Sequence, residues 1–301
     1  MRSPISIIIL TFNEEKNIEA CLNSVCDWVD EIFIVDSFST DKTLEIAKKY
    51  TDKISQHKFE NQAKQLNWAL ETLPLKTEWL LRIDADERVL PELKEELIAK
   101  LPKVKETVNG IYFKRRVYHW GKWIKHGGYY PTWLLRIWRH KKAYCEDRLV
   151  DEHMKLVDGD VEFLKNDIYE ENKKPLTSWT GKHNSYATRE AIETLSLKYN
   201  LSKSQSVQGN LSGTQVQKRR YVKENLYSTA PLFFRVGIYF IYRYIFKLGF
   251  LDGKEGLIFH FLQGFWYRFL VDAKIYEIER KAKESGKDIK TIIQELHNII
   301  L

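Results

Sequence analysis

The side chains best suited to chemistry in this sequence are two carboxylates, Asp84 and Asp86, which one alanine separates. They follow the apolar run 79–81, which is typical of a buried strand whose end carries charge. Two neighbouring carboxylates are costly to bury unless a cation pairs with them, and carboxylate oxygens suit Mg²⁺ or Mn²⁺, which also hold phosphates. Asp84 and Asp86 are therefore candidate metal ligands that share a diphosphate. The alternative is a solvated acidic turn before a helix that begins at Pro91.

The elements that would position these acids alternate between strands and helices. Continuous apolar runs at 5–10 and 31–36 predict strands that are covered on both faces. Helical spacing of apolar residues follows each run, and further helices are expected at 62–73 and from residue 91. This rhythm predicts an α/β fold with a doubly wound, mainly parallel sheet.

Ligands of such sheets bind beyond the carboxyl ends of the strands. Three predicted strands end there in polar side chains: Thr11, Asn13 and Glu14, then Asp36, then Asp84 and Asp86. Each acid alone could be a helix cap, but three groups at one edge favour a site. Neither GxGxxG nor GxxxxGK[ST] occurs, which argues against a dinucleotide-binding dehydrogenase and a P-loop NTPase. A nucleotide diphosphate bound without a glycine-rich loop needs a metal ion.

Four motifs at 6–15, 36–43, 63–67 and 84–87 resemble, in this order, the family-2 inverting glycosyltransferases of the GT-A fold. The resemblance implies a nucleotide-diphosphate sugar as donor, a UDP-sugar first of all, and Mn²⁺ or Mg²⁺ as cofactor. It implies metal binding by Asp86 and Asp84. It assigns donor contacts to these residues: Thr11, Asn13, Glu14, Asp36, Ser39, Lys64, Asn67 and Asp84.

Residues 110–150 are dense in aromatic and cationic side chains, which stack on sugar rings and pair with phosphates. We expect contacts with the acceptor substrate in this stretch of the chain. The candidates are His126, Tyr129, Trp133 and Arg136, together with His183 from a short segment that resembles the same relatives. A β-rich cap with an aromatic rim is the alternative.

The segment 146–153 resembles the part of lipopolysaccharide-core and capsule enzymes of this family that carries the catalytic base. An inverting transfer needs one carboxylate to take the proton of the acceptor hydroxyl. Glu152 is the first candidate and Asp151 the second. If the segment is a strand, alternation places Val150 and Glu152 on one face and Asp151 on the other, which favours Glu152.

The last hundred residues combine positive charge with aromatic side chains. Residues 200–283 contain 14 Lys/Arg and 6 Asp/Glu, which accounts for the chain's formal net charge of +7. Charges interrupt the apolar runs 231–247 and 257–271 too often for a membrane-spanning helix. The pattern favours helices lying on an anionic membrane surface, with a buried hairpin or a homo-oligomer contact as alternatives. Segment 246–254 resembles a stretch of the same lipopolysaccharide and capsule enzymes.

The three cysteines, Cys21, Cys26 and Cys145, form no CxxC pair, which favours a reducing cytosol. The apolar N-terminal run lacks a cleavage site and predicts a first strand rather than a signal peptide. The expected location is therefore peripheral, at the cytoplasmic face of the inner membrane.

These observations predict a GT-A-like catalytic domain at 1–200, with a nucleotide-sugar half (1–105) and an acceptor half (106–200). A helical, membrane-associated extension follows at 216–301. The expected function is metal-dependent, inverting hexosyl transfer to a lipid-linked, lipopolysaccharide or capsule glycan. The alternatives are a nucleotidyltransferase, which also uses paired acids and a metal, and a nucleic-acid-binding module that uses the basic tail. For the enzyme we expect no nucleic-acid partner.

Overall fold

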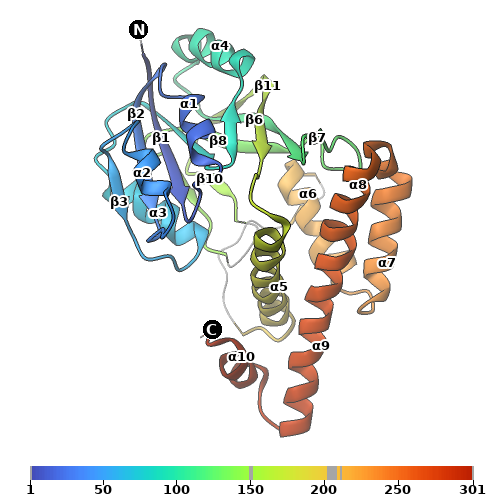
Figure 1. The fold of residues 1–301 in the computed structure, drawn as a ribbon. Helices are drawn as coiled ribbons and strands as arrows, with labels where there is room; N and C mark the ends of the chain where they lie inside the picture. Colours follow the sequence, from blue (N-terminus) through green and yellow to red (C-terminus); the bar gives the residue numbers. More distant parts are fainter. Residues whose placement is uncertain (1, 149–151, 202–208, 211, 300–301) are drawn as a thin grey trace. The chain divides into compact units, whose positions relative to one another are not determined.

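The computed structural model describes residues 2–148, 152–201, 209–210 and 212–299 (Figure 1). The described residues form two compact units. The first, here called the sheet unit, comprises 2–125, 129–147 and 152–174. The second, here called the helical unit, comprises 126–128, 148 and the described residues from 175 onward.

A mixed sheet with the order β3-β2-β1-β4-β8-β6-β11-β5 forms the centre of the sheet unit, and β7 pairs with β6 at its side. Its strands are β1 (Ser3–Thr11), β2 (Val29–Asp36), β3 (Ile54–Gln56), β4 (Trp79–Asp84), β5 (Glu87–Val89), β6 (Val108–His119), β7 (Lys122–Trp123), β8 (Trp133–Arg139) and β11 (Asp160–Glu171). Strands β1 to β4 pair in parallel, as do β6 and β11. Antiparallel pairing begins at β8, which lies between β4 and β6. A separate antiparallel pair joins β9 (Ala143–Cys145) to β10 (Met154–Leu156).

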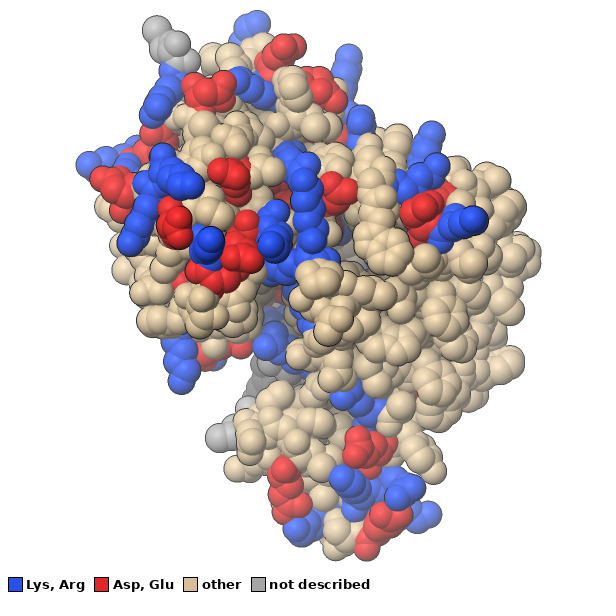
Figure 2. Space-filling model, viewed as in Figure 1, with Lys and Arg blue, Asp and Glu red and all other residues tan. Residues whose placement is uncertain are grey.

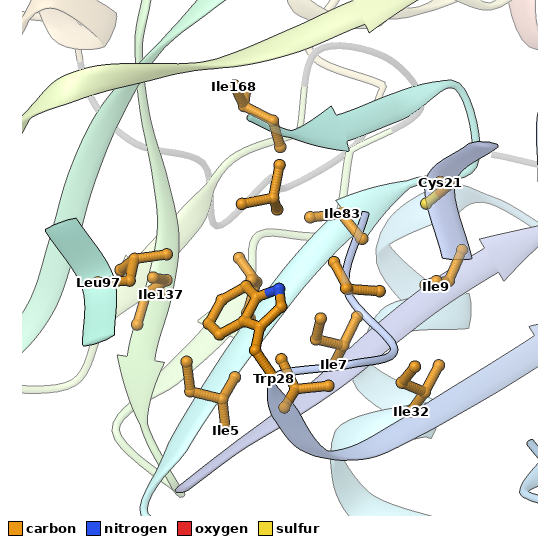
Figure 3. Packing of buried hydrophobic residues seen from close by; sticks show 14 of the residues in the cluster. Ile5, Ile7, Ile9, Cys21, Trp28, Ile32, Ile83, Leu97, Ile137 and Ile168 are labelled. Carbon is orange, nitrogen blue, oxygen red and sulfur yellow. The ribbon is translucent and has the colours of Figure 1, made fainter. Parts of the chain in front are cut away.

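Alternate side chains of β1 enter two different hydrophobic clusters. Ile5, Ile7 and Ile9 lie in the cluster drawn in Figure 3, whereas Ile8 lies in the cluster on the other face. Both faces of the strand are therefore buried, because side chains alternate along a strand. The prediction from the continuous apolar run is confirmed.

The helices of the sheet unit cover both faces of the sheet. Helices α1 (Ile18–Asn23), α2 (Thr43–Ala47) and α4 (Pro91–Lys100) contribute to the cluster of Figure 3, and the short η1 (Leu101–Lys103) follows α4. Helix α3 (Gln62–Thr72) contributes to the opposite cluster together with β9 and β10. Pro91 occupies the first turn of α4, where its missing N–H costs nothing.

The helical unit contains ten helical segments in its described residues: α5 (Leu176–Lys198), α6 (Gln215–Val222), η2 (Lys223–Tyr227), α7 (Phe234–Ile241), η3 (Tyr242–Phe246), η4 (Gly249–Asp252), α8 (Gly253–His260), η5 (Phe261–Trp266), α9 (Tyr267–Ser285) and α10 (Ile289–His297). Its core joins α5, α9 and α10 through residues such as Leu195, Ile275 and Ile293. The predicted acceptor half extends to residue 200. The structure instead assigns α5 to the helical unit, because its buried stripe packs on α9. Within the described part of the chain, no helix combines the length and apolarity needed to cross a bilayer.

Candidate functional site

The loops after β1 and β2 meet around a buried carboxylate, Asp36. The parallel register pairs Thr11 with Asp36 at the carboxyl ends of both strands. The Thr11 hydroxyl donates to Oδ1 of Asp36 at 3.0 Å, and the Ser39 N–H donates to Oδ2 at 2.8 Å. The structure therefore brings together three of the predicted donor residues, and Asp36 arranges the loop that would surround a nucleoside.

Asn13 joins the same two loops from the other side. Its φ of 54° is left-handed, a conformation that asparagine tolerates. Its N–H donates to Oγ of Ser39 at 2.8 Å, and its Oδ1 accepts from the Thr40 N–H at 2.8 Å. The neighbouring Phe12 and Phe38 are more than half exposed and offer flat apolar surfaces beside these loops. Neither phenylalanine is among the predicted site residues, although both stand within the two motifs.

The acidic turn at the end of β4 is surrounded by guanidinium groups. Oδ1 of Asp84 lies 3.3 Å from Nη2 of Arg82, and Oδ2 lies 3.0 Å from Nη2 of Arg136. Arg136 also contacts Glu87 at 2.5 Å. Burial alone would raise the pKa of Asp84, but Arg136 and Arg82 outweigh it and hold this pKa well below its usual range.

The end of β11 supplies groups to this site that are not among the residues predicted from the sequence. Nδ2 of Asn172 donates to Oδ2 of Asp86 at 3.1 Å, and Nζ of Lys174 lies 2.6 Å from Oε1 of Glu14. Burial raises the pKa of Glu14, and Lys174 opposes this effect. Because β6 is parallel to β11 and both run in the direction of β4, residues after β11 reach the same edge of the sheet. Because ligands bind beyond the carboxyl ends of the strands, residues that follow this last strand were also candidates, and Asn172 and Lys174 are among them.

Glu152, the first candidate for the catalytic base, lies close to the acidic turn. Its Oε1 is 3.9 Å from Nη2 of Arg82, the guanidinium that also contacts Asp84. Glu152 precedes β10, which begins at Met154, so strand alternation does not support the choice. Asp151, the second candidate, lies outside the described residues.

Glu146 closes the loop that carries Glu152. Its carboxylate is buried and accepts from the His153 N–H at 3.1 Å, while its own N–H donates to the His153 carbonyl at 3.0 Å. Glu146 and His153 therefore hold the two ends of this loop together. A group committed to that role is poorly placed to act as a base, whereas Glu152 lies beside Arg82.

Two predicted donor residues on α3 have other partners. Nζ of Lys64 pairs with Glu60 at 2.6 Å on the surface. The Asn67 side chain donates to the Cys145 carbonyl and accepts from the Cys145 N–H, both at 2.8 Å. Asn67 therefore fastens β9 to α3 through both ends of its amide.

The predicted acceptor residues are divided between the two units. Tyr129, Trp133 and Arg136 belong to the sheet unit, and the charge of Arg136 is engaged by Asp84 and Glu87. His126 and His183 belong to the helical unit.

His126 and His183 both have partners within the helical unit. Nδ1 of His126 lies 2.6 Å from Oδ1 of Asp252, and His183 stacks on Trp179 with ring centroids 3.5 Å apart. Burial lowers the pKa of His183 to about 4, so this ring is neutral near pH 7. A neutral histidine is a hydrogen-bonding group and not a cation for an acceptor phosphate.

The described residues contain no group of three or more His, Cys, Asp or Glu side chains that could together hold a metal ion. Asp86 is the better of the two predicted ligands, because both oxygens of Asp84 face guanidiniums. A Mg²⁺-type site fits this arrangement, since such ions are often bound by one or two carboxylates and complete their shell with phosphates and water.

The mixed sheet, with parallel strands β1 to β4 and an acidic turn at the end of β4, is a GT-A-like fold. The chain belongs to glycosyl transferase family 2, whose family model matches residues 6–169. The family predicted from the four motifs is therefore confirmed.

Three relatives illustrate the sequence similarity. An uncharacterized glycosyltransferase of Rickettsia bellii is 42% identical over 93 residues, which are 31% of each chain. The glycosyltransferase SunS of Bacillus subtilis is 37% identical over 100 residues, 33% of this chain and 23% of SunS. The lipopolysaccharide core biosynthesis glycosyltransferase LpsC of Rhizobium meliloti is 33% identical over 120 residues, 38% of this chain and 43% of LpsC. The matches thus span less than half the length of these relatives.

Solved structures show more distant similarity. Residues 1–349 of TarS from S. aureus align with 95% of this chain and 92% of that one, at 15% identity and a TM-score of 0.45. Glucosyl-3-phosphoglycerate synthase from Mycobacterium tuberculosis, in complex with Mg²⁺ and UDP, aligns with 38% of this chain and 43% of that one, at 23% identity and a TM-score of 0.31.

Proposed function

We propose that this chain is a metal-dependent, inverting hexosyltransferase that uses a nucleotide-diphosphate sugar, with a UDP-sugar as the first candidate. One observation carries the proposal. Arg82 contacts both Asp84, on the donor side, and Glu152, the candidate base. An inverting displacement needs these two functions on opposite sides of one sugar carbon, within a few ångströms of each other.

In the proposed reaction the acceptor hydroxyl attacks the anomeric carbon of the donor. Glu152 accepts the hydroxyl proton while the new C–O bond forms. The bond from the anomeric carbon to the diphosphate oxygen breaks, and the nucleoside diphosphate leaves with the electron pair. Asp86, assisted by Asp84, would hold a Mn²⁺ or Mg²⁺ ion, which would neutralise charge on the leaving group.

The proposed acceptor is a lipid-linked, lipopolysaccharide or capsule glycan at the cytoplasmic face of the inner membrane. Similarity to LpsC, which is named for lipopolysaccharide core biosynthesis, supports this class. The positive charge of residues 200–283 supports an anionic membrane surface as partner. A homo-oligomer built on the helical unit is the competing arrangement.

Turnover of a panel of nucleotide sugars with Mn²⁺, measured as release of nucleoside diphosphate, tests the function. We expect Asp86→Asn to abolish metal-dependent donor binding and turnover, because it removes the better metal ligand. Asp160→Asn, which changes an exposed acid of the same unit, is the matched control and should keep full activity.

Other outcomes support other functions. Release of pyrophosphate would indicate a nucleotidyltransferase. Normal turnover of wild-type protein in excess chelator would remove the metal from the proposal. Binding to nucleic acid with a steep salt dependence and no effect of metal would favour the nucleic-acid-binding alternative.

A further inference from the structure

The helical unit turns an apolar stripe outward. Along α7 and η3, large apolar side chains recur every three or four residues and are 48–67% exposed: Phe234, Ile238, Ile241, Tyr242 and Ile245. A surface helix of a globular protein normally turns such a stripe toward its core. Figure 2 shows the result as a broad uncharged surface over α7 and α8.

A second stripe continues this surface on α8, η5 and α9. Leu257, Phe261 and Phe269 are each 44–46% exposed. The Phe265 ring stacks on both Phe261 and Phe269, with centroids 5.4 and 6.0 Å apart. The Phe240 ring of α7 lies 5.8 Å from Phe265 and so joins the two stripes. We call the continuous surface formed by both stripes the apolar face.

Segment 246–254 extends the apolar face and adds positive charge. Four of its large side chains are 44–72% exposed: Phe246, Leu248, Phe250 and Leu251. Lys247 and Lys254 are exposed beside them. Within 231–254 the sequence contains one acid, Asp252, which is 2% exposed and contacts His126 and His260. The exposed charge of this segment is therefore positive.

An exposed apolar surface of this extent marks an interaction site. A second copy of the chain is a poor occupant, because a two-fold contact through this face would set Lys247 and Lys254 against a surface of the same sign. An anionic bilayer complements both properties: apolar side chains enter the headgroup boundary, and lysines pair with lipid phosphates.

We infer that the apolar face binds the surface of an anionic lipid bilayer. The inference deepens the proposed function, on which it rests for the lipid-linked acceptor, because it names the surface that would bring the enzyme to that acceptor. The binding itself is a property of residues 231–271 of the helical unit.

Co-sedimentation of the full chain with vesicles tests the inference. The vesicles contain phosphatidylcholine and phosphatidylglycerol in equal parts, or phosphatidylcholine alone. We expect wild-type protein to bind the mixed vesicles. The double variant Ile245→Glu/Phe246→Glu should bind them at least about tenfold more weakly, because it places two charges in the buried part of the contact. Val157→Glu is the matched control, since Val157 is 62% exposed in the sheet unit, and it should bind like wild type.

A charge-reversal variant distinguishes binding to lipid phosphates from binding through apolar side chains alone. Lys247→Glu should weaken binding to the mixed vesicles and leave binding to phosphatidylcholine unchanged, whereas Lys16→Glu, at a side chain that is 63% exposed, should change neither. Circular dichroism checks that each variant is folded. UDP–Mn²⁺ binding measured without vesicles reports on the proposed function separately.

Two results would overturn the inference. Wild-type protein that binds UDP–Mn²⁺ but no vesicles would leave the proposed chemistry intact and remove the membrane contact. A dimer of wild-type protein that the Ile245/Phe246 variant dissociates, together with no vesicle binding, would assign the apolar face to contact between copies of this chain.

Discussion

Arg82 shows how one residue connects the chemistry of two distant segments. It stands two positions before Asp84 on β4, so both side chains project from the same face of the strand. Its guanidinium contacts Asp84 at 3.3 Å and Glu152 at 3.9 Å, and its side chain is 9% exposed. A buried cation between two carboxylates keeps both near the place where donor and acceptor would meet.

Replacing Glu152 tests its role as the base. We expect Glu152→Gln to lower kcat by a factor of roughly 10²–10⁴, because a neutral amide cannot take the hydroxyl proton. Donor affinity, measured by titration calorimetry with UDP and Mn²⁺, should stay the same. Asp151→Asn should be milder. The reverse ranking would move the base by one residue, and loss of donor affinity in Glu152→Gln would place this carboxylate in the donor or metal site instead.

At the scale of elements, the sequence predicts the strands that position Thr11, Asp36 and Asp84, because short continuous apolar runs in an α/β fold form strands that are buried on both faces. It does not predict Asn172, which is 86 residues from its partner Asp86 and reaches it only through the pairing of β11. The position of Glu152 is likewise set by a loop, where side-chain direction follows no periodic rule.

The helical unit depends on a buried carboxylate on α5. Oε1 of Glu190 lies 2.5 Å from Nη1 of Arg268 and 2.8 Å from Nζ of Lys223, and Oε2 accepts from the Tyr267 hydroxyl. These contacts tie α5 to α9 and η2. Burial alone would raise the pKa of Glu190, but Arg268 and Lys223 outweigh it and hold the pKa well below its usual range.

We expect Glu190→Gln to lower the free energy of unfolding of the helical unit by about 3 kcal/mol, because it leaves two cations without their partner. Glu279→Gln, which breaks the more exposed pair between α9 and Lys198 of α5, is the control and should cost less than about 1 kcal/mol. Denaturant unfolding followed by circular dichroism measures both. Similar losses in the two variants would contradict the role of Glu190.

The Glu190 carboxylate also makes the stability of the folded protein depend on pH. The folded pKa of Glu190 lies below its unfolded value, so its contribution is fully present above the unfolded pKa of about 4.3. The contribution is lost as the pH falls through the folded pKa. Wild-type protein should therefore lose more stability than Glu190→Gln on acidification below about pH 5. Parallel acid-induced losses in both proteins would show that this carboxylate is not responsible.

At the scale of the whole molecule, each unit has hydrophobic clusters made of its own residues. Ile5 to Ile168 contribute to the clusters of the sheet unit, and Ala187 to Ile293 to the buried cluster of the helical unit. Two cores in one chain favour two unfolding transitions. The proposed donor site consists of residues of the sheet unit alone, so a donor should stabilise one transition and leave the other unchanged.

Calorimetry of the full chain tests this division. UDP and Mn²⁺ at about 100 times their Kd should raise the midpoint of one transition by roughly 5–10 °C, since ligand binding to the native state contributes about 2.7 kcal/mol at that concentration. Glu190→Gln should lower the other midpoint, which identifies it as that of the helical unit. Asp86→Asn should abolish the ligand-induced shift without changing the helical transition. A ligand shift in the transition that Glu190→Gln lowers would place the donor outside the sheet unit, and a single transition that moves in both experiments would show that the two units unfold as one cooperative block.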